Sequence, residues 1–259
     1  MDQRILRFEG VTNFRDYGGY ATVGGGRVKT GKLFRSAHHG RATDPDLAEI
    51  AALDIAVVVD LRHVHERTRD PSRRHPAFAP EVIQSDIGED ADDSWRRFLL
   101  ESDLSPDAFH DHALRFYREA PFEARYVDLY SRYFRALAHS GGGTLIHCAA
   151  GKDRTGILAA LTHHLLGVHP DDAIADYLLT NQAVDFEGLI PMLSDAIFRQ
   201  LGRRPSPEAT RVAMSVELAY LENALAEIKA VHGGLDAYMA DRLGVDAAAR
   251  DAIAARLLA

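Results

Sequence analysis

Residues 144–156 read TLIHCAAGKDRTG, and the pattern of this stretch decides the expected fold. Its opening residues suit the end of a buried strand, and the mainly apolar residues 157–166 that follow suit a buried helix. An earlier segment, residues 55–61 (IAVVVDL), is almost continuously apolar and β-branched, as in a strand covered on both faces. The alternation of strands and helices predicts an α/β fold with a mostly parallel central sheet flanked by helices.

The chain is expected to form a single domain that spans residues 1–259, because no internal repeat or low-complexity linker divides it. Two segments break the alternation of strands and helices, residues 88–125 and 181–210, and we expect them to be helical insertions near the functional site. For residues 88–125, an irregular or helical excursion over the site and a plain surface insertion are both open. Apolar residues at spacings of four and three from Met214 to Ile228 predict one amphipathic helix.

Cys148 lies where the expected strand ends and a loop leads to the expected helix. Backbone N–H groups in such a loop converge on one point, and the helix dipole makes that point favourable for a dianion. The same field favours the thiolate form of a cysteine at the mouth of the loop. Arg154 follows after five intervening residues, and its planar guanidinium matches two phosphate oxygens.

These features predict a phosphoryl-transfer site in which Cys148 is the nucleophile and Arg154 is the clamp. The expected phosphate-binding loop comprises Ala149, Ala150, Gly151, Lys152, Asp153 and Arg154. The site is expected to need no metal and no cofactor, because the amide groups and the guanidinium supply the charge stabilisation.

Two other interpretations of this loop are weaker. Free cysteine is among the most buried residue types, so a purely structural thiol is one alternative for Cys148. The glycines at positions 151 and 156 and the basic pair Lys152 and Arg154 argue against it. A nucleotide-binding P-loop needs Ser or Thr after the lysine and a glycine at the start of the motif, where this chain has Asp153 and Ile146.

The run from Cys148 to Arg154 resembles the Cys-x5-Arg signature of the protein tyrosine phosphatase superfamily, and its core GKDRTG is similar to that of the bacterial tyrosine and phosphoinositide phosphatases. Only this loop is highly specific. Other segments from about residue 10 onward resemble the same family: NFRDYGGY (13–20), LFRSA (33–37), VVDLR (58–62) with Glu66 beyond it, GGLDAY (233–238) and LGV (243–245). The resemblance implies a phosphatase fold and hydrolysis through a cysteinyl-phosphate intermediate.

The general acid that protonates the leaving alkoxide is the least determined residue of the site. The family resemblance implies that an aspartate inside the loop can serve, which makes Asp153 the first candidate. Asp60 is the second, because it ends a central strand at the edge where open α/β sheets form active sites. An ion pair with Arg62 or the loop is an equally good role for Asp60. Further carboxylates precede the cysteine without a recognisable motif: Asp111, Glu119, Glu123 and Asp128.

Three neighbours of the nucleophile are expected to support it. His147 points to the opposite side of the strand from Cys148, so we expect it to tune the thiol by packing and hydrogen bonding. Thr155 is expected to donate its hydroxyl to the cysteine sulfur. Lys152 adds charge that a phosphotyrosine alone does not require, which predicts either recognition of lipid head groups or inositol phosphates, or orientation of the loop.

The composition limits the partners and the compartment. A net charge of −8 argues against a nucleic-acid-binding surface, which would be basic. The chain contains one cysteine, so it has no internal disulfide, and the cytoplasm is the expected compartment, with secretion lacking a conventional signal left open. No apolar stretch approaches the length of a membrane span, so no integral membrane segment is expected.

The predicted function is that of a cysteine-dependent phosphomonoesterase acting on phosphotyrosine and on phosphoinositides or other phosphorylated substrates. Its expected partner is a phosphorylated protein or a phosphoinositide, and the oligomeric state is left open. A rhodanese-like sulfurtransferase is one alternative, but a persulfide carrier does not need an arginine at this spacing. The other is a phosphate-binding module without turnover, which would not need to keep both Cys148 and Arg154.

Overall fold

A five-stranded sheet lies at the centre of the computed structural model, which describes residues 2–88 and 94–259. The strands follow the order β1-β2-β5-β3-β4, with the bounds β1 Arg15–Asp16, β2 Leu33–Ser36, β3 Ile55–Asp60, β4 Glu81–Ile83 and β5 Gly143–His147. Strand β5 pairs in parallel with β2 and β3, and β3 pairs in parallel with β4. Strand β1 pairs antiparallel with β2. The predicted α/β class with a mostly parallel sheet is confirmed.

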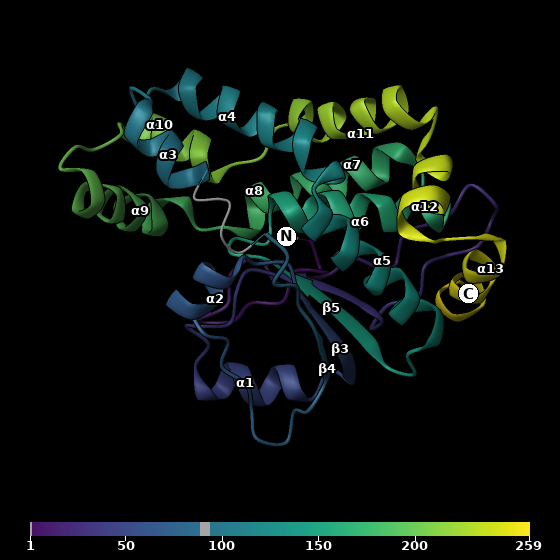
Figure 1. The fold of residues 1–259 in the computed structure, drawn as a ribbon. Coiled ribbons are helices and arrows are strands. Elements are labelled where there is room, and N and C mark those ends of the chain that lie inside the picture. Colours follow the sequence, from purple (N-terminus) through teal and green to yellow (C-terminus); the bar gives the residue numbers. More distant parts are fainter. Residues whose placement is uncertain (1, 89–93) are drawn as a thin grey trace.

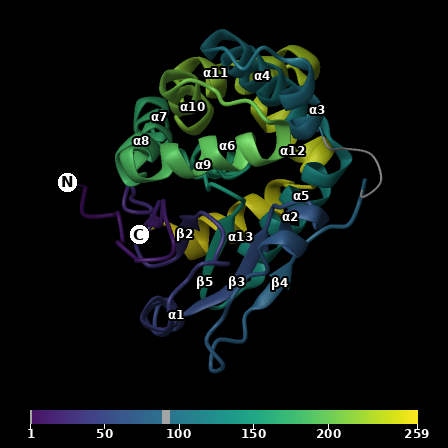
Figure 2. The ribbon, with the colours of Figure 1, turned by 90° about the vertical axis from the view of Figure 1, so that its left-hand side faces the viewer.

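Each face of the sheet is covered by its own apolar core, because alternate side chains of a strand point to opposite faces. On one face, Val58 and Leu145 pack with residues of helix α1 (Asp44–Ala51). On the other face, Val59 and Ile146 belong to a larger core that includes residues of α5 and α6. Figure 2 shows α1 on one side of the strands and α5 with α13 on the other.

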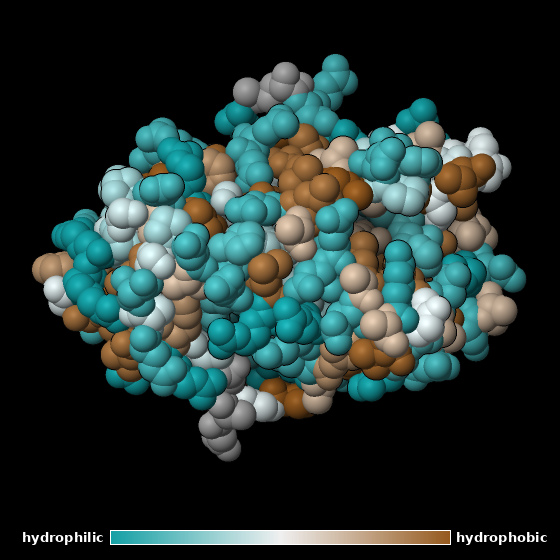
Figure 3. Space-filling view, turned by 90° about the horizontal axis from the view of Figure 1, so that it is seen from above, coloured by the Kyte–Doolittle hydropathy of each residue, from teal (hydrophilic) through white to brown (hydrophobic). Residues whose placement is uncertain are grey.

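A thick layer of helices covers the sheet on the side of the larger core (Figure 1). The bounds of the helices besides α1 are α2 Val64–Arg69, α3 Ser94–Glu101, α4 Pro106–Glu119, α5 Ala124–His139, α6 Asp153–Leu165, α7 Pro170–Leu178, α8 Thr180–Ala183, α9 Phe186–Leu201, α10 Pro207–Met214, α11 Leu218–His232, α12 Leu235–Leu243 and α13 Ala247–Leu257, with a 3₁₀ turn at Ala120–Phe122. Seen from above, the outer face of this layer mixes hydrophilic with apolar side chains (Figure 3).

The two predicted insertions pack against each other. The described part of the segment 88–125 is helical and contributes α3 and α4, whereas residues 89–93 lie outside the described residues. Phe109 of α4 shares a small apolar core with Ile197 of α9 and Ala209 of α10. The two segments therefore form one helical unit, whose α4 and α10 are in extensive contact.

The prediction of one continuous helix from Met214 to Ile228 is wrong, because α10 ends at Met214 and α11 begins at Leu218. Ser215 and Glu217, which lie between them, are extended, and Asn181 explains why. Its side chain accepts a hydrogen bond from the Val216 backbone N–H (2.9 Å) and donates one to the Val216 carbonyl (2.8 Å). An amide side chain thus takes the two backbone groups that a helix would need at this position.

Candidate active site

Cys148 follows the last residue of β5, the strand that lies between β2 and β3, and precedes the first turn of α6. Helix α6 has no side-chain cap at its N-terminus, so its first N–H groups have no side chain to bind them. Such a helix end is a site for an anion, because the helix dipole adds to the free donors. The sequence pattern predicted this order of strand, cysteine loop and helix.

The carbonyl groups of the loop point outward to buried side chains. The Asn13 amide donates to the carbonyls of Ala150 (3.0 Å) and Gly151 (2.9 Å). The Arg35 guanidinium donates to the carbonyls of Gly151 (3.0 Å) and Lys152 (3.5 Å). In a planar trans peptide the N–H points away from the carbonyl. The N–H groups that follow these carbonyls therefore face the opposite direction, toward the inside of the loop.

Gly151 has the backbone conformation that the loop requires at its tightest point. Its φ is +67°, a region that residues with a side chain rarely adopt. A Cβ atom at this position would lie 2.3 Å from the Ser36 carbonyl oxygen. Glycine is thus required both by the backbone angle and by the approach of β2.

A buried ionic network holds the two side chains that bind the loop. Asp176 of α7 lies 2.8 Å from the Arg35 guanidinium and 3.3 Å from that of Arg15, and all three are buried. Arg15 in turn donates to the Asn13 side-chain oxygen. Burial opposes ionisation of Asp176, but the two arginines outweigh it and lower its pKa to about 2. The carboxylate is therefore ionised at neutral pH and fixes both guanidinium groups.

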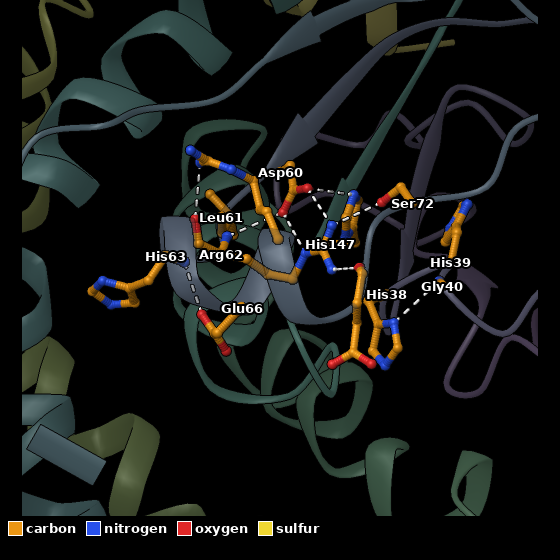
Figure 4. A network of polar contacts seen from close by, with 12 residues as sticks. His38, His39, Gly40, Asp60, Leu61, Arg62, His63, Glu66, Ser72 and His147 are labelled. Carbon is orange, nitrogen blue, oxygen red and sulfur yellow. Dashed lines mark hydrogen bonds and ion pairs between the residues drawn. The ribbon is translucent and has the colours of Figure 1, made fainter. Parts of the chain in front are cut away.

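Arg154 is held by two parallel contacts to a carboxylate. Its guanidinium lies 2.5 Å and 2.8 Å from the two oxygens of Glu66 in α2, and it also donates to the Leu61 carbonyl (3.3 Å). Burial disfavours the Glu66 carboxylate, but Arg154 outweighs this effect and lowers its pKa. Glu66 also accepts the His63 backbone N–H (2.8 Å), which completes a capping box at the start of α2. Glu66 therefore ties the orientation of Arg154 to a helix end. Figure 4 shows the contact of Glu66 with the His63 backbone.

Asp60 forms an ion pair with Arg62, which is one of the two roles predicted for it. Its oxygens lie 2.8 Å and 2.7 Å from two nitrogens of the guanidinium, and the Arg62 backbone N–H adds a third bond at 3.1 Å. Despite burial, His147 and Arg62 lower the pKa of Asp60 to about 2. Arg62 continues the network to Ser72 (2.8 Å; Figure 4). A carboxyl with this pKa has no proton to donate at neutral pH, so the geometry favours the positioning role.

His147 lies inside the protein and contacts the same network. Its Nε2 is 3.7 Å from an Asp60 oxygen, and its ring stacks on that of His39 at 5.3 Å between centroids. Burial lowers the pKa of His147 to about 4, so the ring is neutral at physiological pH. This position agrees with packing beside the thiol rather than with proton transfer to the substrate.

The Lys152 ammonium binds backbone carbonyls of the break between α10 and α11. It donates to the carbonyls of Ala213 (2.5 Å) and Ser215 (3.2 Å) and lies 3.7 Å from Asp153 Oδ1. Carbonyls at a helix end lack intrahelical partners, so a cation there is favourable. Of the two predicted roles of Lys152, this geometry supports orientation of the loop.

Asp153 occupies the first turn of α6, and 26% of its side chain is exposed. The Tyr117 hydroxyl donates to its Oδ1 (2.9 Å). The predicted hydrogen bond from Thr155 to the Cys148 sulfur is not formed: the Thr155 hydroxyl is buried without a partner among the described residues.

Comparison with known proteins identifies the family. A family model described as the tyrosine phosphatase family matches residues 6–259. The chain belongs to the tyrosine phosphatase family. It is 34% identical over 248 residues to a protein of Cupriavidus necator named as a tyrosine-protein phosphatase, covering 94% of this chain and 85% of the relative. It is also 31% identical over 268 residues to the triple specificity protein phosphatase PtpB of Mycobacterium tuberculosis, covering 92% of this chain and 93% of the relative.

Family membership sets aside the sulfurtransferase and the module without turnover, because the chain is a hydrolase of the protein tyrosine phosphatase type. Within residues 2–88 and 94–259, no helix is long and apolar enough to cross a membrane. The same ranges contain no group of three His, Cys, Asp or Glu side chains that could hold a metal ion.

Several residues that shape this phosphatase site were not assigned a role from the sequence: Asn13, Arg15, Arg35, Glu66, Tyr117 and Asp176. The sequence could have indicated a role for Arg35, because a charged residue inside an apolar strand that is covered on both faces needs a buried polar partner. Asn13 opens the segment 13–20 that resembles the family, and its φ of +56° is a conformation in which asparagine is enriched. Its contacts with the loop carbonyls join residues 137 and 138 positions apart, so no local pattern shows them. Asp176 carries no local signal in its helix.

Proposed function

We propose that this phosphatase hydrolyses phosphotyrosine through a cysteinyl-phosphate intermediate. The observation that supports the proposal most directly is the loop itself. Its carbonyls bind Asn13 and Arg35, its N–H groups face inward, and Cys148 and Arg154 stand at its two ends. Such a loop stabilises the three equatorial oxygens of a phosphoryl group during in-line transfer.

In the first step, the Cys148 thiolate attacks phosphorus, so the Sγ–P bond forms as the P–O bond to the leaving group breaks. The Asp153 carboxyl gives its proton to the leaving oxygen. In the second step, water attacks phosphorus and passes a proton to the Asp153 carboxylate. The Sγ–P bond then breaks, its electron pair returns to sulfur, and inorganic phosphate leaves.

Arg154 is assigned to the equatorial oxygens of the transferred group. Its fork can bind two oxygens at once, and Glu66 holds the other edge of the guanidinium at 2.8 Å and 2.5 Å. Because an ammonium group cannot make two parallel bonds, Arg154→Lys should be nearly as damaging as Arg154→Ala. We expect a loss of about a hundredfold or more in kcat/KM for both variants, as for the loss of a main oxyanion donor.

Two observations bear on the substrate class. The M. tuberculosis relative is named as a triple specificity phosphatase, which suggests substrates beyond phosphotyrosine. Lys152 suggested lipid head groups at first, but its ammonium binds the carbonyls of Ala213 and Ser215. We therefore put phosphotyrosine first and phosphoinositides second, and a comparison of kcat/KM for a phosphotyrosyl peptide and a soluble phosphoinositide decides the order.

The intermediate is tested by rapid denaturation in SDS at alkaline pH during turnover of a ³²P-labelled phosphotyrosyl peptide. Cys148 is the only cysteine of the chain, so a protein-bound label that survives alkali and is released in dilute acid, as an S–P bond is, reports this residue. The parent enzyme should give labelled protein, and Cys148→Ser should give neither label nor turnover while it still binds phosphate. Turnover of Cys148→Ser within tenfold of the parent would refute the mechanism.

A further inference from the structure

Two buried tyrosines from separate helices form a chain of hydroxyl groups that ends on Asp153. The Tyr117 hydroxyl of α4 lies 2.9 Å from Asp153 Oδ1 and 2.7 Å from the Tyr177 hydroxyl of α7. The exposed fraction of each tyrosine is 1% or less. Burial, with the Asp153 charge as the next cause, raises the pKa of both phenols well above the usual value, so both hydroxyls keep their protons at neutral pH.

The number of protons fixes the direction of the chain. Each phenol has one proton, and the Tyr117 proton is used in the bond to Asp153. The bond between the two hydroxyls must then be donated by Tyr177. When Asp153 is ionised, each hydroxyl in the chain is therefore oriented, and Tyr117 presents a donor to Oδ1.

The two oxygens of Asp153 have different surroundings. Oδ1 accepts the Tyr117 hydroxyl and is also the oxygen nearest the Lys152 ammonium, at 3.7 Å. No hydrogen bond or ion pair within the described ranges engages Oδ2. When the carboxyl is protonated, a donor and a cation both face Oδ1, so the proton belongs on Oδ2.

We propose that Tyr117, oriented by Tyr177, is a positioning residue that assigns the acidic proton of Asp153 to Oδ2 and stops the carboxyl group from rotating. This inference rests on the proposed role of Asp153 as general acid. It also gives the segment 88–125 a task at the site, because α4 carries Tyr117.

Both chemical steps use this arrangement. In the first step the Oδ2–H bond breaks and the proton moves to the leaving oxygen, while the Tyr117 hydroxyl bond to Oδ1 strengthens as negative charge develops. In the second step Oδ2 accepts the proton of the attacking water. Tyr117 keeps its own proton throughout, so it acts through Asp153 and does not touch the substrate.

The test compares Tyr117→Phe, Tyr177→Phe and Asp153→Asn on two substrates, p-nitrophenyl phosphate and an alkyl phosphate with a poor leaving group. A poor leaving group depends more on the proton. Tyr117→Phe should lower kcat for the alkyl phosphate about tenfold and for p-nitrophenyl phosphate less than about threefold, a fraction of the total effect of general acid catalysis. Tyr177→Phe should show the same pattern with a smaller effect.

A matched control is Tyr133→Phe. Tyr133 is fully buried, and its hydroxyl bonds Tyr17 (2.7 Å) and Thr162 (2.9 Å), away from Asp153. The variant Tyr133→Phe measures how much the loss of a buried phenol hydroxyl lowers the stability of the fold, without a change near Asp153. We expect Tyr133→Phe to lower the melting temperature as much as Tyr117→Phe and to leave the ratio of the two kcat values unchanged.

A double-mutant cycle separates this inference from the proposed acid. In the Asp153→Asn background, Tyr117→Phe should have no further leaving-group effect, because the proton it positions is gone. Leaving-group dependence in Asp153→Asn but not in Tyr117→Phe or Tyr177→Phe would overturn the positioning role alone. No leaving-group dependence in Asp153→Asn would overturn the role of Asp153 itself. Should Tyr117→Phe fail to fold, Tyr177→Phe carries the same comparison.

Discussion

Glu66→Gln removes the charge that holds Arg154 while it keeps almost the same side-chain shape. The parent pair makes contacts of 2.5 Å and 2.8 Å, and the two side chains are only 13% and 11% exposed. Glutamine replaces one acceptor oxygen by an NH2 group, which cannot accept a hydrogen bond from the guanidinium. The capping box should survive, because glutamine serves at this position as well as glutamate does.

The expected size of the effect follows from the lost bond. A hydrogen bond to a charged group contributes about 1.5–3 kcal/mol, and about 1.4 kcal/mol corresponds to a factor of ten in rate. Because the freed guanidinium must be reoriented for each turnover, kcat/KM should fall between about tenfold and a hundredfold. The assay measures kcat/KM for p-nitrophenyl phosphate. The inhibition constant of inorganic phosphate, a competitive inhibitor, shows whether the phosphate-binding loop still binds its anion.

The control for this variant is Asp44→Asn, which breaks the ion pair of Asp44 with Arg73 at 2.6 Å. Those side chains are 86% and 48% exposed, so kcat/KM should not change. In an Arg154→Ala background, Glu66→Gln should add little to the loss. Two results would refute the view that Glu66 acts by orienting the guanidinium. One is a fall in kcat/KM of less than about threefold in Glu66→Gln. The other is that Glu66→Gln lowers kcat/KM in the Arg154→Ala background as much as it does in the parent.

Three further perturbations test the support of the loop. Gly151→Ala should reduce kcat/KM more than about a hundredfold, because the backbone has φ +67° and the new Cβ would lie 2.3 Å from the Ser36 carbonyl oxygen. The variant should also lose phosphate binding, which calorimetry measures. Asp176→Asn leaves two buried arginines without their carboxylate and should destabilise the fold by about 3–5 kcal/mol in urea unfolding. Because the pKa of Asp176 is lowered from 3.8 to about 2, its stabilising effect is complete above pH 3.8 and is lost as the pH falls toward 2, and the variant should lack this acid-dependent part. Asp60→Asn should lower kcat for aryl and alkyl phosphates equally. A selective loss of kcat on alkyl phosphates would indicate that Asp60 is the general acid.

The parts of the structure that could be predicted from the sequence are those set by neighbouring residues. The apolar run at residues 55–61 forms the buried strand β3, and the run before Cys148 forms β5. Strand burial and the glycine at the loop depend on a few adjacent residues, so their pattern is visible locally. The order of strands around β5 then placed the cysteine at the carboxyl edge of the sheet.

The parts that could not be predicted depend on residues far apart in the chain. The break between α10 and α11 was missed because its cause, the Asn181 side chain, lies 35 residues before Val216. The contact of Lys152 with the carbonyls at that break was missed for the same reason. A periodic apolar pattern records only which face is buried, and it does not record a polar side chain that competes for the backbone.

The two aspartates show how tertiary partners assign roles that residue type leaves open. Asp153 and Asp60 are the first and the second candidate for the acid from the sequence, and both lie beside the cysteine loop in the fold. Asp60 receives three N–H groups from Arg62, which hold it as a carboxylate, whereas Asp153 receives one neutral hydroxyl and keeps a partly exposed side chain. Asp60 is therefore held in its ionised form by charged donors, whereas Asp153 keeps one carboxylate oxygen without a hydrogen-bond partner among the described residues. Under the proposed assignment, Arg62 keeps Asp60 as an ion-pair partner, and Tyr117 of α4 orients Asp153 as the acid.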